Sequence, residues 1–286
     1  MGMELGGILV VQHMGPRSYM VARVKRVIET RKSKFQKIEI VELEEFGRAL
    51  IIDGLIQSTE SDEVYYHESL VHPAMILHPK PRKILIIGGG EGATLREVLK
   101  HNTVELAVMV DIDEVVIELC KKHLECMHKG AFEDPRAKIV ISDGLKYVDE
   151  VHELFDVVIL DLTDPYASVI ARKLYTEQFY RKIYGKTSSG GVMVTQAGNS
   201  FFYEKEYLEA VKAVKQVFPI VLEYNVWIPS FAYACNFILA SKKYDPKTLT
   251  PNDVDERLKE RNVETVFFSG KTWNAIINTP IYRKQH

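Results

Sequence analysis

The sequence is poor in cysteine, in long apolar runs and in charge of one sign. Its 286 residues contain three cysteines, Cys120, Cys126 and Cys235, and this number excludes a disulfide scaffold. It has no run of about 18 apolar residues, so no segment is expected to cross a membrane. Its net charge of −2 gives no basic face for nucleic acid. We therefore expect neither a membrane partner nor a nucleic-acid partner.

The start of the sequence and the positions of two cysteines bear on where the protein resides. The segment MGMELGGILVVQHMGPRSY has no basic residues ahead of its apolar ones, and we expect no signal peptide. Cys120 and Cys126 lie in a segment that reads as one helix, where six positions rotate by roughly 600° and place them on different faces. This disfavours a shared metal or a bridge and favours buried thiols. These features predict a cytoplasmic protein.

The chain divides into two parts by its hydrophobic pattern. Hydrophobic residues make up 46% and charged residues 27% of the chain, as in an ordinary globular protein. Residues 35–60 alternate between apolar and polar side chains, with a turn at Asp53-Gly54, and predict antiparallel β-structure. The next segment, ESDEVYYHESLVHPAMI, has helical spacing and ends at the prolines of HPKPRK. We predict a small antiparallel β domain over 1–62 and a catalytic domain over 63–286.

From Lys83 onward, apolar strands alternate with amphipathic helices. The strands ILII, LAVMVDI, KIVISD, FDVVILDL and GGVMVTQ are each followed by a helical segment, which predicts a parallel sheet covered on both faces. Two final strand-like runs, IVLEYNVWIP and NFILASK, predict a terminal antiparallel hairpin. The predicted fold class is therefore α/β, with a Rossmann-like, methyltransferase-type doubly wound sheet. After Lys243 the sequence reads as polar and irregular.

The segment ILIIGGGEGATLREVLKH places a glycine turn between the first strand and the next helix. Gly88, Gly90 and Ala93 fit the dinucleotide pattern G-x-G-x-x-G/A, so the pattern alone leaves NAD open, and Gly92 completes the turn. We expect these glycines to contact a nucleoside. Glu91 lies inside the turn, where a carboxylate would repel a pyrophosphate. A ligand that carries an ammonium group would instead be attracted.

Two more acids end the next two strands. Asp111 follows the turn by about 20 residues, where a carboxylate can bind both ribose hydroxyls. Its alternative role is to cap the helix that begins near Asp113. Asp143 closes the third strand in VISDG and is placed either to accept from an adenine amino group or to cap the following helix. With Glu91, these acids indicate an adenine nucleoside with a cationic tail and no phosphates.

An acid pair, Asp161 and Asp164, follows the fourth strand in DLTDP, where Pro165 prevents a helix from starting. The pair has four interpretations: a metal site, a glycosidase pair, an amine-binding pair or a solvated turn. A metal site requires further ligands that the adjacent residues do not offer, and a glycosidase has no use for a nucleoside pocket. Amine binding fits best, because one acid can take a proton from an attacking nitrogen. The segment HESLVH (67–72) is no zinc helix, since its histidines are five residues apart and roughly 140° from sharing a face.

Five segments, SKFQ, DGLIQSTESDEVYYHE, GGGEGATLREVLKH, VDIDEVVI and DLTDP, occur in the order known from the polyamine aminopropyltransferases, or spermidine synthases. The chain resembles this family from about Ser33 to Lys242. The resemblance implies a small β domain ahead of a methyltransferase-like sheet. It also implies transfer of an aminopropyl group from decarboxylated S-adenosylmethionine to an amine, which leaves 5'-methylthioadenosine. The donor is then a co-substrate, and we expect no cofactor and no metal.

The resemblance also implies roles for individual residues. Glu91 meets the amino group of the aminopropyl tail, Asp111 meets the ribose, and Asp143 with Gly144 meets the adenine region. Asp161 is the catalytic residue that deprotonates the amine, and Asp164 helps to hold the amine chain. The remaining expected substrate contacts are Gln36, Gln57, Tyr66 and His67.

The acceptor amine is less well defined than the donor. His67 stands where many relatives have glutamine, and DLTDP replaces DSSDP, so the chain looks more like the agmatine-using and thermospermine-forming branches. The candidate acceptors are putrescine, agmatine, cadaverine and spermidine. IPSFAY (228–233), with Tyr224 before it, either lines the acceptor pocket or packs under the final hairpin, and Trp227 is expected in the core.

Two alternatives remain beside the aminopropyltransferase. The first is an S-adenosylmethionine-dependent small-molecule methyltransferase on the same fold, against which Glu91 and DLTDP weigh. The second is a catalytically inactive nucleoside-binding protein, against which the joint presence of Tyr66, Asp111 and Asp161 argues. The resembled family usually forms homodimers or homotetramers through its N-terminal β domain, and we expect the same here.

Overall fold

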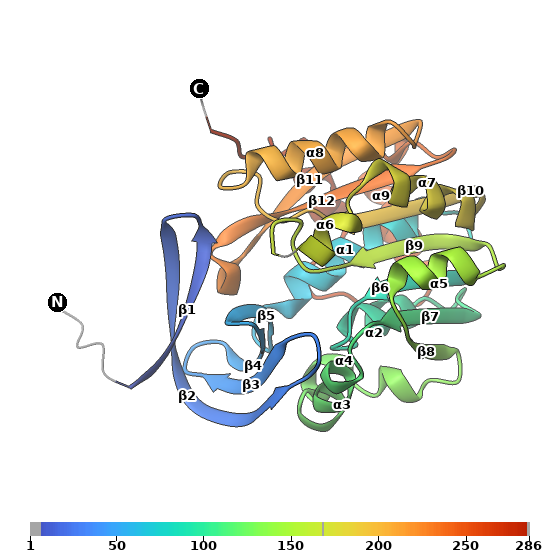
Figure 1. Cartoon of the computed structure of the whole chain (residues 1–286). Coiled ribbons are helices and arrows are strands. Elements are labelled where there is room, and N and C mark those ends of the chain that lie inside the picture. The colour runs from blue at the N-terminus through green and yellow to red at the C-terminus, as the bar shows by residue number, and fades with distance from the viewer. Residues whose placement is uncertain (1–6, 168, 285–286) are drawn as a thin grey trace.

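The computed structural model describes residues 7–167 and 169–284 and contains two sheets (Figure 1). The first is an antiparallel five-stranded sheet in the order β1-β2-β3-β4-β5. Its strands are β1 (Ile8–Gly15), β2 (Ser18–Lys32), β3 (Lys37–Leu43), β4 (Gly47–Ile52) and β5 (Leu55–Thr59). The turn from β4 to β5 has Asp53 and Gly54 at φ of 48° and 83°, the left-handed conformation that a tight hairpin requires. The predicted turn at this position is confirmed.

The second sheet has seven strands in the order β11-β12-β10-β9-β6-β7-β8. The five strands from β6 to β10 are parallel, whereas β11 and β12 form an antiparallel hairpin at one edge. Their bounds are β6 (Lys83–Gly88), β7 (Leu106–Asp111), β8 (Ala137–Ile141), β9 (Phe155–Asp161), β10 (Thr187–Gln196), β11 (Ile220–Ile228) and β12 (Tyr233–Ser241). The predicted α/β fold with a terminal hairpin is confirmed.

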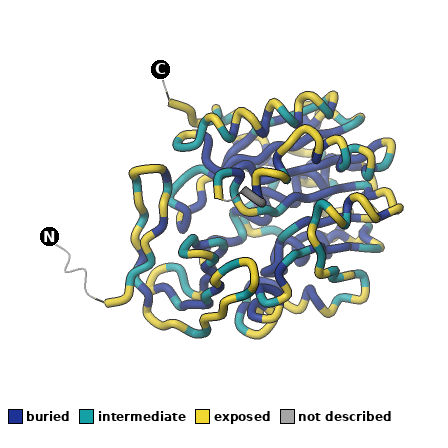
Figure 2. The backbone as a smooth tube through the Cα atoms, in the orientation of Figure 1, coloured by how far each residue is buried: buried dark blue, intermediate teal, exposed yellow. Residues whose placement is uncertain are grey.

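Helices cover both faces of the seven-stranded sheet, because alternate side chains of each buried strand point to opposite faces. Ile84 and Ile86 pack in a core with α1, α2, α9 and α10, whereas Leu85 and Ile87 pack with α5, α7 and α8. Figure 2 shows the buried strands enclosed by helices with exposed outer faces. The helices are α1 (Glu63–Leu77), α2 (Ala93–Leu99), α3 (Glu114–His123), α4 (Glu125–His128), α5 (Gly144–Glu150), α6 (Val169–Lys173), α7 (Glu177–Lys186), α8 (Glu204–Lys215), α9 (Pro251–Glu260) and α10 (Gly270–Asn278).

The N-terminal sheet is larger than the sequence predicts. The antiparallel β-structure starts at Ile8, whereas alternation was recognisable only over residues 35–60. The long β1–β2 hairpin carries exposed apolar side chains, so its pattern does not separate an inner face from an outer one. The last strand ends at Thr59 and α1 begins at Glu63. The division of the chain after residue 62 stays a prediction.

Three expectations from the sequence are wrong. The segment after Lys243 is not irregular, since it contains α9 and α10, each begun by a reciprocal capping box. The segment with two cysteines is two helices, because the chain leaves the helical conformation at Leu124, and both thiols are free. Trp227 is 60% exposed rather than buried, because it lies on the outer face of β11 between two inward-facing residues.

The junction between the two sheets is held by one buried acid. Asp62 accepts hydrogen bonds from Thr59 Oγ1 at 2.6 Å and from the backbone N–H of Ser230 at 2.6 Å. Ser230 lies in the turn between β11 and β12, so this contact fixes the start of α1 against the terminal hairpin. Among the helices in the described parts of the chain, none combines the length and apolar character that a membrane span requires.

Candidate active site

The predicted site residues gather at the carboxyl ends of adjacent parallel strands. The chain runs from β6 outward through β7 and β8 and then returns to the other side of β6 with β9, so strand order reverses between β6 and β9. Ligands of doubly wound sheets bind at this reversal. Gly88, at the end of β6, lies opposite Asp161, at the end of β9, while Asp111 ends the neighbouring strand β7.

The glycine turn after β6 has no room for side chains. Gly88 and Gly92 have φ of +84° and +87°, which disfavours other residues. A Cβ atom at Gly88 would lie 2.0 Å from the carbonyl oxygen of Asp161, and one at Gly90 would lie 2.7 Å from Oδ2 of Asp111. The turn therefore passes directly over the two acids, which leaves Glu91 as the residue of the GGGEG turn with a side chain.

Asp111 is a partly buried acid whose side chain accepts from one backbone donor. Its Oδ1 accepts the N–H of Asp113 at 2.9 Å. Burial of the carboxylate raises its pKa from 3.8 to about 6, against the opposing effect of that hydrogen bond. Asp113, and not Asp111, caps α3 by accepting the N–H of Val115. Asp113 also accepts from Ser33 Oγ at 2.6 Å and from Gln36 Nε2 at 3.0 Å, so Gln36 reaches the site from the N-terminal sheet.

Asp143 and Gly144 begin α5 beyond the end of β8. Asp143 caps the helix, because its Oδ1 accepts from the N–H groups of Leu145 at 2.7 Å and Lys146 at 3.4 Å. The capping role considered from the sequence is therefore present, and both bonds end on the same oxygen. Gly144 packs against β6, where a Cβ atom would lie 2.6 Å from Cγ2 of Ile87. A larger residue at this position would displace the start of α5.

Asp161 is the most closely contacted of the acids. Its Oδ1 accepts from the hydroxyl of Tyr66 at 2.7 Å, and its Oδ2 accepts from Thr94 Oγ1 at 2.6 Å. Burial and the negative charge of Glu91 raise the pKa of Asp161, whereas His67 lowers it. Burial and the charge of Asp161 raise the pKa of Tyr66 well above 10, so Tyr66 is a neutral donor.

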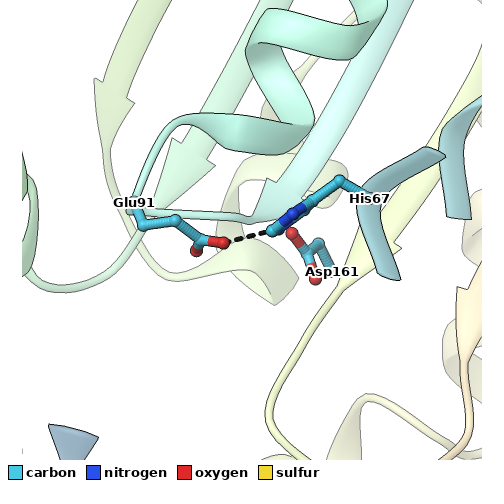
Figure 3. A group of neighbouring side chains, drawn as sticks. All are labelled: His67, Glu91 and Asp161. Atoms are coloured by element: carbon cyan, nitrogen blue, oxygen red, sulfur yellow. Dashed lines mark ion pairs between the residues drawn. The ribbon is translucent and has the colours of Figure 1, made fainter. Parts of the chain in front are cut away.

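Glu91 has a cationic partner within the protein. His67 Nε2 lies 2.5 Å from Glu91 Oε1, and Figure 3 shows the two side chains meeting beside Asp161. The other ring nitrogen, Nδ1, lies 2.8 Å from Glu63 Oε2. Burial lowers the pKa of His67, but the charges of Glu91 and Glu63 outweigh it and raise the pKa well above 6.5. From the sequence we expected a ligand ammonium beside Glu91, and no signal there indicated that His67 is its neighbour.

Asp164 lies among aromatic side chains. It accepts a hydrogen bond from the hydroxyl of Tyr233 at 3.4 Å, and its burial raises its pKa. The ring of Tyr166 stacks on that of Tyr203 with centroids 3.6 Å apart. Tyr233 belongs to the IPSFAY segment, so this segment contributes directly to the surroundings of Asp164. The contact joins residues 69 positions apart, and no local sequence signal indicates it.

Gln57 and Tyr224, two further predicted contacts, each donate a hydrogen bond to a backbone carbonyl group. Gln57 lies on β5, and its side-chain amide donates to the carbonyl of Leu55 at 3.1 Å. Tyr224 is fully buried, and its hydroxyl donates to the carbonyl of Ser69 at 2.7 Å. The ring of Tyr224 stacks on Phe237, which in turn contacts the ring of Tyr66. Tyr224 therefore packs one layer behind Tyr66 in the core.

Two groups of described side chains are close enough to share a metal ion: His67, Glu91 and Asp161, and separately Glu68, His72 and Glu97. In the first group both oxygens of Asp161 accept from protein donors, and Oε1 of Glu91 lies 2.5 Å from Nε2 of His67. In the second, Glu68 accepts three backbone N–H groups from residues 266–268, each at 2.8 Å. Glu97 pairs there with Lys100 at 2.8 Å. Ion pairs and hydrogen bonds account for both groups.

The fold and this strand-end site define an α/β enzyme of the methyltransferase-like architecture. Residues 63–251 match the model of the spermine/spermidine synthase domain, and residues 12–60 match that of the spermidine synthase tetramerisation domain. Because the first match covers more than half of the chain, the chain belongs to the spermine/spermidine synthase family. The family resemblance drawn from the five segments is confirmed, and the methyltransferase alternative is not favoured.

Relatives and solved structures agree with this family. The polyamine aminopropyltransferase of Pyrobaculum calidifontis is 54% identical over 282 residues, which cover 98% of each chain. That of Sulfolobus acidocaldarius is 41% identical and covers 94% of this chain and 90% of its own. A spermidine synthase crystallised with the transition-state analogue AdoDATO superposes with a TM-score of 0.90 at 35% identity, covering 98% of this chain and 95% of that one.

Proposed function

We propose that this protein transfers the aminopropyl group of decarboxylated S-adenosylmethionine to a di- or polyamine and releases 5'-methylthioadenosine. The observation that carries the proposal is the placement of Glu91, inside the glycine turn, beside Asp161 at the reversal of strand order. A carboxylate at this point attracts a cationic tail, and the second carboxylate can accept a proton from an amine. Membership of the spermine/spermidine synthase family supports the same reaction.

The donor would lie along the ends of β6, β7 and β8. Asp111 would accept from the ribose hydroxyls, Asp143 with Gly144 would contact the adenine, and Glu91 would bind the ammonium group of the aminopropyl tail. The backbone of Gly88, Gly90 and Gly92 would pass close to the nucleoside, because the turn lies directly against Asp161 and Asp111. Gln36, which reaches Asp113 from the N-terminal sheet, and Gln57 would border the donor on that side.

The acceptor would approach from the side of Tyr66 and Asp164. Its nitrogen attacks the carbon next to the sulfonium, so a C–N bond forms, a C–S bond breaks, and the sulfonium leaves as a neutral thioether. A primary amine is mostly protonated near neutral pH, like lysine with its pKa near 10.4. Asp161 would take the proton that the nitrogen must lose, while Tyr66 orients that carboxylate. In-line alignment of the two substrates supplies the remaining rate enhancement.

The charge of Glu91 would also separate the donor from ordinary S-adenosylmethionine. The ordinary form carries a carboxylate beside its amino group, whereas the decarboxylated form carries only the cation. Glu91 would therefore attract one and repel the carboxylate of the other, which is specificity by repulsion. The branch of the family and the preferred acceptor amine stay predictions.

A competition assay tests the reaction. The enzyme is given decarboxylated S-adenosylmethionine with putrescine, agmatine, cadaverine and spermidine together, and the products are identified by mass. We expect 5'-methylthioadenosine to appear as one or more amines gain an aminopropyl group, and the dominant product identifies the acceptor. Release of S-adenosylhomocysteine from S-adenosylmethionine, with no 5'-methylthioadenosine from any amine, would instead indicate a methyltransferase. Failure of both reactions would indicate an inactive binding protein.

We further propose that the protein is a homodimer or homotetramer assembled through the five-stranded sheet. The β1–β2 hairpin exposes Ile8, Val11, Tyr19 and Val21, and such a group of apolar side chains favours contact with a second copy. The match of residues 12–60 to a tetramerisation domain supports this. Light scattering of the purified protein should give two or four times the chain mass of 32.7 kDa. A monomer at micromolar concentration would contradict the proposal.

Two further points stay proposals: that the reaction needs no cofactor or metal, and that the protein is cytoplasmic. The chemistry supports the first, because the sulfonium already activates the donor carbon and no electron transfer is involved. Turnover that survives dialysis against a chelator would agree with it, and turnover restored by an added divalent cation would contradict it. The small number of cysteines, all free in the structure, supports the second.

A further inference from the structure

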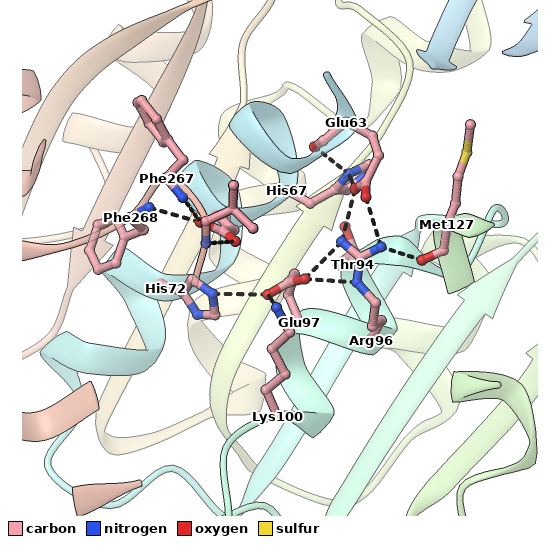
Figure 4. A network of polar contacts seen from close by, with 12 residues as sticks. Glu63, His67, His72, Thr94, Arg96, Glu97, Lys100, Met127, Phe267 and Phe268 are labelled. Atoms are coloured by element: carbon pink, nitrogen blue, oxygen red, sulfur yellow. Dashed lines mark hydrogen bonds and ion pairs between the residues drawn. The ribbon is translucent and has the colours of Figure 1, made fainter. Parts of the chain in front are cut away.

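A series of buried polar contacts leads from Arg96 in the interior to Glu91 at the site. Figure 4 shows its inner part, from Arg96 through Glu63 to His67. Arg96 donates from Nη1 and Nη2 to the two oxygens of Glu63, each at 2.8 Å. Glu63 accepts from Nδ1 of His67 at 2.8 Å, and Nε2 of His67 lies 2.5 Å from Glu91. Glu63, His67 and Arg96 are only 4%, 1% and 6% exposed. This series of contacts begins at Arg96 in the core and ends at Glu91 on the donor side.

The Arg96–Glu63 pair has one well-defined geometry. A bidentate arginine–carboxylate contact fixes both planes, and a lysine cannot reproduce it. Arg96 is itself held by Glu97, which accepts from Nε at 2.7 Å, and by the carbonyl of Met127. Arg96 lies on α2, which directly follows the glycine turn, whereas Glu63 and His67 lie on α1. The pair therefore sets the position of α1 relative to the turn that carries Glu91.

The surroundings of His67 favour the doubly protonated ring. A neutral imidazole has one donor and one acceptor nitrogen, but here a carboxylate lies next to each nitrogen. The charged and titratable groups around the ring are Glu63 and Tyr66 from α1, Glu91 from the glycine turn and Asp161 from β9, with Arg96 acting through Glu63. Ligand atoms of His67, Glu91 and Asp161 all lie within 4.8 Å of one another.

We propose that Glu63 and Arg96 are positioning residues that hold His67 as an imidazolium between Glu91 and Asp161 and thereby keep Asp161 ionised. Two carboxylates this close repel each other, and one of them retains a proton unless a cation separates them. An imidazolium beside both is such a cation, and the two carboxylates next to its nitrogens belong to the protein and not to a substrate. The proposal rests on the proposed role of Asp161 as the base, because only an ionised Asp161 can accept the proton of the amine.

The isosteric variant Glu63→Gln tests the proposal through the pH profile of kcat/KM for the amine. The amide removes the negative charge that favours the imidazolium, so His67 loses its proton more easily and Asp161 takes one up more easily. We expect the acidic limb of the profile to move to higher pH by about one unit. At a pH on that limb kcat/KM should fall by about tenfold, and on the alkaline plateau it should fall by less than about threefold. Arg96→Lys should shift the limb in the same direction by a smaller amount.

His72→Gln provides the matched control. His72 lies on the same helix and in the same buried network, where its Nε2 pairs with Glu97 at 3.0 Å, but its contacts do not include His67. It should lower stability without moving the acidic limb. Denaturant unfolding of all three variants shows whether each is folded. A limb that moves equally in His72→Gln and Glu63→Gln would mean that the network acts only through general stability, and the proposal would be rejected.

A second measurement reads the protonation of His67 directly rather than through activity. Nitrogen-15 chemical shifts of the histidine side chains in the wild-type protein report the protonation of His67, with the signal assigned from its absence in His67→Gln. We expect an imidazolium at pH 8, and a neutral ring at the same pH in Glu63→Gln. A neutral ring in the wild type would overturn the proposal. If the ring is charged but Asp161→Asn keeps full turnover, the assignment of the base fails while the positioning of His67 stands.

Discussion

The negative charge of Asp111, which we propose binds the donor, should make the free protein less stable. Its pKa rises from 3.8 to about 6 on folding because the carboxylate is buried. Between about pH 4 and pH 6 the folded state therefore holds more protons than the unfolded state, and stability falls as pH rises through this window. A shift of about two units corresponds to about 3 kcal/mol as an upper limit, at about 1.4 kcal/mol per unit. The stability that the protonated carboxyl of Asp111 contributes should be fully lost above about pH 6.

The variant Asp111→Asn isolates this effect. The side-chain oxygen that accepts the N–H of Asp113 at 2.9 Å is retained, while the charge is removed. We expect the variant to exceed the wild type in free energy of unfolding by about 1–3 kcal/mol at pH 7.5 and to match it at pH 4. Urea unfolding at the two pH values measures this difference. Donor affinity should fall by about tenfold or more, since a hydrogen bond to a charged acceptor contributes about 1.5–3 kcal/mol.

Donor binding to the wild type gives the complementary measurement. Only the ionised form of Asp111 offers a charged acceptor, so calorimetric Kd should be constant above about pH 7 and should rise by up to about tenfold per unit below about pH 6. Equal donor affinity at pH 5 and pH 7.5 would refute the ribose role. A variant that is less stable than the wild type at pH 7.5 would refute the account of burial, because it would mean that Asp111 contributes favourable contacts as a charged group.

Three further substitutions test other parts of the site. Asp161→Asn should keep donor binding but lower kcat by about 10² or more, as the loss of a general base does, and an unchanged kcat would remove Asp161 from that role. Glu91→Gln should reduce the ratio of inhibition constants that separates S-adenosylmethionine from the decarboxylated donor, and the repulsion argument is wrong if the ratio stays the same. Tyr66→Phe should lower kcat/KM for the amine by about tenfold, because Asp161 loses the hydroxyl that lies 2.7 Å away. Retention of the wild-type value would show that Thr94 alone orients the acid.

The parts of the fold that the sequence predicts are those whose pattern is set by local burial. The strands β6, β7 and β9 lie in the middle of the sheet, are covered on both faces and are mostly apolar, which distinguishes them from the helices between them. The final helices could not be predicted in this way, because only a narrow face of each is buried. Trp273 of α10, for example, packs against Tyr224 of β11, 49 positions earlier along the chain, and nothing near it in the sequence indicates this partner.

The site, like the fold, has features that the sequence predicts and features that it does not. Asp111 and Asp161 could be predicted because each ends a parallel strand, and such ends meet at one edge of the sheet. The contacts of Glu63 with Arg96 and of Asp164 with Tyr233 could not, because they depend on how α1 and the terminal hairpin cross that edge. Polar contacts of this kind leave no periodic pattern, since each requires only one polar residue from each of two distant segments.

The balance of charge in the site explains how a small change in the donor can decide between binding and rejection. Glu91 and Asp161 share one imidazolium, whereas Asp111 and Asp164 have neutral partners among the contacts described. The site therefore has more acids than internal cations. A decarboxylated donor would bring a sulfonium and an ammonium, and these positive charges would offset part of the excess of acids. Ordinary S-adenosylmethionine would add a carboxylate to the same buried region, where repulsion is weakly screened. Selection by charge of this kind requires no difference in shape between the two donors.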